Sequence, residues 1–259
     1  MIYEVIKGLS LPFIGTLIGV LCVLFVKNNL SEAVQGSLCG FAAGVMTAAS
    51  VWSLLLPSLE YTEDLGALCF APAAVGFMVG IFFVMILDKI TESVLFARAG
   101  EAGNDKKRRG VMLSVAVCVH NIPEGMAVGI VYAELLAGGL GVSAASALAL
   151  AFGIALQNIP EGAIISVPLK AQGESSLKAL AIGVISAAVE LLGALVTVAV
   201  AGKLLIIMPY ALAFAAGAMM YVVASELLPE AKRQGQSSVG VFAFAVGFCV
   251  MMALDTVFS

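Results

Sequence analysis

The sequence is dominated by apolar segments long enough to cross a lipid bilayer. A helix needs roughly 20 such residues to span the hydrocarbon, and segments of this length are helices rather than strands of a barrel. Hydrophobic residues make up 61% of the chain and charged residues 12%, whereas soluble domains carry roughly 25% charge. The sequence therefore predicts an all-α integral membrane protein. Eight transmembrane helices are expected, near residues 9–26, 33–56, 70–88, 111–133, 142–167, 177–201, 204–228 and 239–257.

The lysines and arginines predict which ends of these helices face the cytoplasm, because cytoplasmic loops are enriched in them. With eight spans, 11 of the 13 lysines and arginines fall on one side, and only Lys7 and Lys203 fall on the other. We expect a single transmembrane domain over residues 1–259 in the cell (inner) membrane, with both termini outside. The loop at 89–110, between the third and fourth helices, is then cytoplasmic.

The sequence contains no basic patch with interleaved aromatic residues, so we expect no nucleic-acid partner.

Two pairs of segments repeat within the chain. Residues 120–125 (HNIPEG) and 157–162 (QNIPEG) are identical at five of six positions and lie 37 residues apart. Residues 42–57 also resemble residues 215–229, with a one-residue shift between the two halves of the match. In each pair the two spans are expected to run in opposite directions, so both repeats are inverted. Inverted repeats that share a site near the membrane midplane are a recurring transporter architecture.

Ionisable side chains lie inside the expected spans, where each costs at least ~2.5–3.5 kcal/mol on insertion scales. No lysine or arginine lies at matching depth, so protons or a metal ion must neutralise the carboxylates. His120 and Glu124 are four residues apart and share a helix face, as do Gln157 and Glu161. Such a mixed nitrogen and oxygen set suits Zn²⁺, Fe²⁺, Mn²⁺ or Cd²⁺. Residues that can complete the set, or lie beside it, are Asn121, Asn158 and Glu190.

Other functions remain open at this stage. Glu226, near the inner end of the seventh span, is either part of a solvated helix end or a metal exit site. A proton-coupled carrier of a non-metal solute, with the glutamates as a proton relay, is an alternative. An intramembrane metalloenzyme is disfavoured, because it requires two histidines in a HExxH helix and the chain has a single histidine. We therefore expect no enzyme and no cofactor, with metal as the transported substrate.

The repeated hexapeptide and the mid-span Glu190 resemble the ZIP (Zrt-, Irt-like) family of divalent metal transporters, in its bacterial GufA-like branch. The resemblance covers essentially the whole chain. It implies import of zinc, and also of cadmium, iron or manganese, by a bundle of spans one, four, five and six that moves against the other four. It also implies a homodimer. The implied first site is His120, Glu124, Gln157 and Glu161, and the implied second site is Asn121, Glu124, Asn158, Glu161 and Glu190, so that two glutamates bridge the metals.

Three features depart from the family pattern. Many relatives place histidine where Gln157 stands, and a neutral amide should bind metal more weakly. Some relatives with two metals carry aspartate where Asn158 stands, so this chain has one negative charge fewer there. The loop at 89–110 contains no histidine, which argues against a metal-collecting loop.

Overall fold

The structure is a computed structural model of the chain. It describes residues 2–25, 31–99, 105–138, 142–171, 173–201, 207–232 and 237–258. Within these ranges, the side chains of 105–120 and of a few further helical positions lie outside the description. The described residues form helices and turns and contain no strand, so the predicted all-α class is confirmed.

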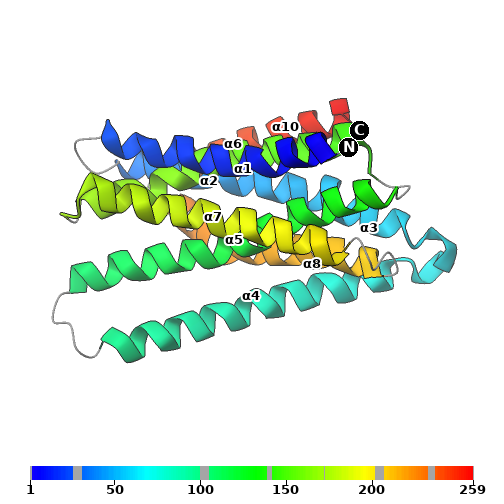
Figure 1. Ribbon diagram of the computed structural model, residues 1–259, viewed down its shortest axis with the longest axis horizontal. Helices are drawn as coiled ribbons and strands as arrows, with labels where there is room; N and C mark the ends of the chain where they lie inside the picture. Colours follow the sequence, from blue (N-terminus) through cyan, green and yellow to red (C-terminus); the bar gives the residue numbers. More distant parts are fainter. Residues whose placement is uncertain are drawn as a thin grey trace.

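The helices run side by side along one direction, and both chain termini lie at the same end of the bundle (Figure 1). We name this the termini end and the other the opposite end. The elements are α1 (Ile2–Leu21), η1 (Cys22–Leu24), α2 (Glu32–Ala49), η2 (Ser50–Leu55), α3 (Leu56–Glu60), η3 (Glu63–Leu68), α4 (Phe70–Ala99), α5 (Asp105–Ala137), α6 (Ala144–Ala171), α7 (Ser176–Ala201), α8 (Met208–Val222), η5 (Val223–Leu227), α9 (Leu228–Ala231) and α10 (Ser237–Phe258).

Six stretches of the described chain are long and apolar enough to cross a membrane. They coincide with six of the eight expected spans: Tyr3–Leu24, Ala33–Glu60, Phe70–Ile90, Ser176–Val200, Met208–Ala231 and Ser238–Val257. Large apolar side chains on these helices are exposed, for example Phe82 on α4 and Phe242 on α10, as expected where acyl chains replace water. α5 and α6 are long helices at the two remaining expected positions, but they are not among the six, so we keep their crossing as part of the proposed function.

Two helices extend further than the apolar pattern predicts. The expected loop at 89–110 is helical up to Ala99 in α4 and again from Asp105 in α5, because charged residues such as lysine and arginine are good helix formers outside the bilayer.

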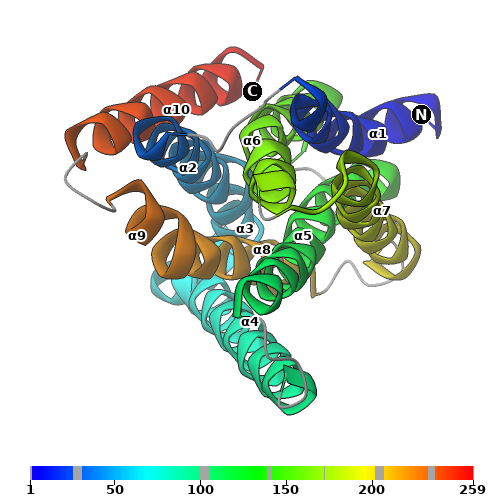
Figure 2. The same ribbon diagram turned by 90° about the vertical axis from the view of Figure 1, so that its left-hand side faces the viewer.

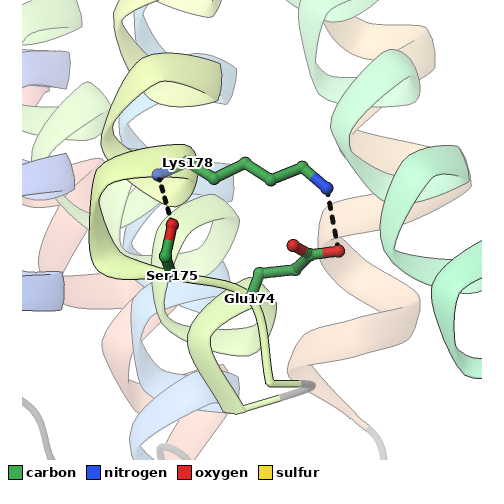
Figure 3. A network of polar contacts seen from close by, with 3 residues as sticks. All are labelled: Glu174, Ser175 and Lys178. Carbon is green, nitrogen blue, oxygen red and sulfur yellow. Dashed lines mark hydrogen bonds and ion pairs between the residues drawn. The ribbon is translucent and has the colours of Figure 1, made fainter.

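At the opposite end, α7 begins with a small polar network (Figure 3). The Lys178 ammonium pairs with Glu174 at 2.9 Å, and the Lys178 backbone N–H donates to Ser175 Oγ at 3.2 Å.

The helices associate in close pairs at glycines. α1 packs on α6, α5 on α7, α2 on α10 and α4 on α8. A methyl group added at Gly19 of α1 would overlap the carbonyl oxygen of Ile159 in α6, and one at Gly40 of α2 would overlap that of Gly240 in α10. Small residues of this kind let membrane helices approach closely.

The four pairs can be assigned to two groups, which also pack on each other through α2 and α6 and through α5 and α8. Contacts between α1 and α7, and between α5 and α6, join the first two pairs. We call α1, α5, α6 and α7 the site bundle, and the remaining helices the second bundle. Seen from the opposite end, the site bundle lies on one side and the second bundle curves around the other (Figure 2). The buried apolar core lies largely where the two meet, with Met46, Ile154 and Met219 among its fully buried side chains.

The second repeat contains a matching irregularity in both copies. α2 passes into the π-helical turn η2 just before Pro57, and α8 passes into the π-helical turn η5 just before Pro229. Proline clashes with the carbonyl four residues earlier in an α-helix, and a wider π turn relieves that clash. η2 has six residues and η5 has five. This difference accounts for the one-residue shift between the two halves of the sequence repeat.

Candidate metal site

The polar side chains of the repeated hexapeptide meet in the interior of the site bundle. Glu124 lies on α5, and Gln157 and Asn158 lie one turn before Glu161 on α6. Glu190 comes from α7. Glu124, Gln157, Asn158 and Glu190 are at most 2% exposed, whereas Glu161 is partly exposed. The structure therefore brings together five of the residues that the sequence singled out, from three helices.

Gln157 occupies the centre of this group. Its Nε2 donates to Glu124 Oε1 at 2.8 Å, to Glu161 Oε2 at 3.0 Å and to Asn158 Oδ1 at 3.0 Å. Three oxygen acceptors around one atom identify it as the NH₂ end of the amide, because an oxygen there would meet only other oxygens. Gln157 thus links the carboxylates of α5 and α6.

Asn158 extends the network to α7 and α1. Its Nδ2 donates to both carboxylate oxygens of Glu190 at 2.9 Å and to the backbone carbonyl of Pro12 at 3.2 Å. Thr16 Oγ1 also lies 3.3 Å from Glu190 Oε2 and 3.2 Å from the Pro12 carbonyl. Neither Pro12 nor Thr16 of α1 was among the residues that the sequence predicted for the site. Their signal was a threonine one turn after a proline, in the middle of the first span.

Two buried polar atoms of the group have no hydrogen-bond partner among the described residues: Glu124 Oε2 and Gln157 Oε1. Leaving a buried acceptor unsatisfied costs ~1–3 kcal/mol, and more for a charged group. Both atoms are oxygens able to ligate a cation. Such atoms in a native fold call for a functional explanation, and a ligand that binds oxygen is the direct one.

The glycines that end the two hexapeptides bring the outer helices to the site. A methyl group at Gly125 would overlap the Glu190 carbonyl oxygen on α7, and one at Gly162 would crowd the backbone of α1 at Thr16 and Val20. Glycine therefore lets α7 present Glu190, and α1 present Thr16, to the carboxylates. The two copies of the hexapeptide therefore have the same structural role. Each copy supplies polar residues to the group, and each ends in a glycine against which one further helix packs.

The other three expected residues are His120, Asn121 and Glu226. The His120 side chain lies outside the described part of the structure. Asn121 is buried, and the hydrogen bond described for it runs from Nδ2 to the backbone carbonyl of Ser186 on α7 at 3.4 Å. Glu226 lies in η5 of the second bundle and is partly exposed. Among the described side chains, no group of three or more His, Cys, Asp and Glu residues has the spacing of a metal centre.

A cavity of about 530 Å³, lined by both polar and apolar side chains, lies at the termini end, between the two bundles. Its lining includes Glu60 of α3, Asp255 of α10 and Val131 of α5. Ser53 Oγ donates to Asp255 Oδ1 at 2.6 Å in its wall. Val131 is seven residues from Glu124 on the same helix, which corresponds to about 10 Å at 1.5 Å per residue. The cavity therefore reaches α5 about two helical turns from Glu124, on the side of the termini end.

Comparison with known proteins identifies the family. A profile described as ZIP Zinc transporter matches residues 97–255, a stretch that contains both hexapeptides and Glu190. The chain is 34% identical to Zinc transporter ZIPB of Bordetella bronchiseptica, over 98% of its own length and 81% of that protein. It is 31% identical to Zinc transporter ZIP11 of Xenopus tropicalis, over 98% and 97% of the two lengths. It is also 31% identical to Zinc transporter GufA of Myxococcus xanthus, over 93% of each. The chain belongs to the ZIP family.

Membership of the ZIP family confirms the resemblance seen in the sequence, including its GufA-like character. ZIP proteins are multi-pass membrane transporters of metal ions and not enzymes, and metal is their substrate rather than a cofactor. The buried polar network therefore belongs to a ZIP protein. Its α5 and α6 residues come from the two copies of the repeated hexapeptide, and Glu190 comes from α7.

Proposed function

We propose that this chain carries divalent metal cations, zinc in particular, across the membrane into the cytoplasm. The observation that supports the proposal is the largely buried group of three carboxylates and two amides from three helices. Within it, one carboxylate oxygen and one amide oxygen have no hydrogen-bond partner among the described residues. The similar proteins of Bordetella, Xenopus and Myxococcus all bear the name zinc transporter, which agrees with this chemistry.

The proposed first metal position is formed by His120, Glu124, Gln157 and Glu161. One imidazole, two carboxylates and one amide oxygen form a four-ligand set of the kind that zinc accepts, and cadmium, iron and manganese suit the same donors. The proposed second position is formed by Asn121, Glu124, Asn158, Glu161 and Glu190. The shared glutamates make the site binuclear in type. Two carboxylates balance the charge of one dication, which leaves the loaded site close to neutral.

The division into two bundles supports transport by alternating access. Every proposed ligand belongs to the site bundle, so a rigid movement of α1, α5, α6 and α7 carries the whole site. Away from the cavity, the surface between the bundles is largely apolar and rich in small residues, with Ala43 on α2, Ala151 on α6 and Ala216 on α8 all buried there. One described hydrogen bond crosses it, from the Tyr61 hydroxyl to Glu134 Oε1 on α5 at 2.6 Å. Such a surface presents few polar bonds that must break when one bundle slides on the other. The cavity beside Asp255 then admits the cation from the termini end.

The proposed function also includes how the chain is oriented in the membrane. α5 and α6 cross together with the six apolar spans, and give eight crossings in one domain over residues 1–259. Lys170 lies in the last turn of α6, Lys178 in the first turn of α7, and Lys232 directly after α9. Because cytoplasmic loops are enriched in lysine, these residues favour the cytoplasm for the opposite end. Both termini then lie outside the cell (inner) membrane. Pairing of two copies, which the family resemblance implies, belongs to the same proposal.

Uptake by purified protein in liposomes tests the function. Vesicles that contain a zinc-sensitive dye are exposed to external zinc, with protein-free vesicles as the background. We expect uptake that saturates with zinc, and loss of at least about tenfold in His120→Ala and in Glu161→Ala, since loss of even an outer partner of a metal ligand typically costs about 10- to 100-fold in metal affinity. Lys178→Ala, at the exposed start of α7, is the matched control and should transport like the wild type.

Two results would overturn the proposal. Undiminished uptake in both ligand variants would show that the cation takes another route. A wild-type protein that neither transports zinc or cadmium nor retains them in elemental analysis would favour the non-metal solute carrier instead.

A further inference from the structure

The amide of Gln157 turns its NH₂ group, and not its oxygen, toward the carboxylates. This orientation does not suit the binding of a cation. Its NH₂ group donates to Glu124 on α5 and to Glu161 on α6. Its oxygen, the one atom of this side chain that can ligate a metal, is buried and has no hydrogen-bond partner among the described residues. An NH₂ group that already bonds both carboxylates leaves no room for a dication between them.

Asn158 repeats this arrangement one residue further along α6. Its NH₂ group faces both oxygens of Glu190, and its Oδ1 accepts from Gln157. The groups described as donating to Glu124 and Glu190 are therefore neutral amides and the Thr16 hydroxyl. The partial positive charge of these donors partly compensates carboxylates that are buried inside the bundle.

A loaded site needs the opposite orientation of Gln157. The terminal torsion of glutamine is broad and roughly two-fold, so turning the amide over exchanges the places of Nε2 and Oε1 without moving the helix. After that turn the amide oxygen faces Glu124 and Glu161, and a cation can bind all three. The unpartnered Oε1 seen here is the atom that gains a partner on loading.

We propose that the Gln157 amide is the internal counter-group of the empty carrier: its NH₂ lies between Glu124 and Glu161 when no cation is bound and turns away when one arrives. This inference rests on the proposed function. An alternating-access carrier must return its empty site across the membrane, and buried carboxylates without compensation make that return costly. With the amide in place, donors of the chain itself compensate part of the carboxylate charge of the empty site, and this lowers the cost of its return. The lower cost favours net uptake over exchange of one metal for another.

Two transport modes separate loaded movement from empty return. Net uptake is measured as zinc entering metal-free vesicles, and exchange as labelled external zinc entering vesicles preloaded with unlabelled zinc. Both are repeated with cadmium. Gln157→Glu keeps an oxygen ligand but replaces the donor with a further carboxylate. Gln157→Met keeps the length and a soft ligand atom but donates no hydrogen bond. Gln35→Glu is the matched control, since Gln35 Nε2 donates to Glu230 Oε1 at 2.8 Å within the second bundle.

For the wild type and Gln35→Glu, net uptake should proceed at a rate comparable with exchange. Both Gln157 variants should lower net uptake about tenfold relative to exchange, which corresponds to ~1.4 kcal/mol on the empty return. The inference fails if both variants keep the wild-type ratio of net uptake to exchange, or if the wild type exchanges metal without net uptake. Absence of both modes in the wild type would instead overturn the proposed function itself, and the inference with it.

Discussion

Thr16 shows how one side chain can shape a site without being one of its expected ligands. It is buried on α1, with its hydroxyl 3.3 Å from Glu190 Oε2 and 3.2 Å from the Pro12 carbonyl. The same carbonyl accepts from Asn158. A hydroxyl that holds one oxygen of Glu190 fixes the rotation of the carboxylate, and therefore the direction in which the other lone pairs point.

Replacing Thr16 tests this positioning role. Thr16→Val keeps the shape and removes the hydroxyl, so the half-saturating zinc concentration should rise roughly 2- to 10-fold, in line with ~0.5–1.5 kcal/mol for one hydrogen bond. The maximal uptake rate should change less, because Glu190 itself remains. Thr16→Ser restores the hydroxyl and should restore the wild-type value. Equal zinc dependence in the valine and serine variants would show that Thr16 only fills space.

At the scale of helices, the position of Glu190 depends on how closely α7 approaches α5. Gly125 lies directly against the carbonyl oxygen of Glu190, whereas Gly193, one turn later on α7, has more room. A methyl group at Gly193 would lie 3.2 Å from the Ile122 carbonyl oxygen. An alanine at Gly125 should therefore separate α5 from α7. An alanine at Gly193 is the matched control on the same pair of helices, because it should leave their spacing nearly unchanged.

Gly125→Ala should push α7 away from α5 at the level of the carboxylates. Overpacking of this kind costs ~1–3 kcal/mol, so we expect a lower unfolding temperature in detergent and a loss of zinc uptake of about tenfold or more. Gly193→Ala should change both quantities far less. Circular dichroism melting and liposome uptake measure the two effects. Wild-type uptake by Gly125→Ala would contradict the dependence of the site on this contact.

For the whole molecule, composition and the length of the apolar segments were enough to predict the all-α class and six of the membrane-spanning stretches. The hexapeptide repeat was enough to predict Glu124 and Glu161 as neighbours. Pro12 and Thr16 were visible as a proline and a threonine one turn apart in the first span, but their contact with the site depends on which face of α1 packs against α6. Amide orientation was also hidden from the sequence, since it follows from the acceptors that the fold places around Gln157. The one-residue shift in the second repeat was visible in the sequence. Its cause, a difference in length between two π-helical turns, was not, because no local sequence pattern predicts such a turn.

The orientation of the whole bundle decides whether the proposed transport is import, and it can be tested without any transport assay. Glu63 is exposed at the termini end and Lys178 is exposed at the opposite end. In a protein from which the five native cysteines have been removed, Glu63→Cys should react with a membrane-impermeant thiol reagent on intact cells. Lys178→Cys should react only after the cells are permeabilised, because lysine-rich ends remain in the cytoplasm. The reverse pattern would place the cavity beside Asp255 on the cytoplasmic side, and labelling of both positions in intact cells would contradict a bundle that spans the membrane.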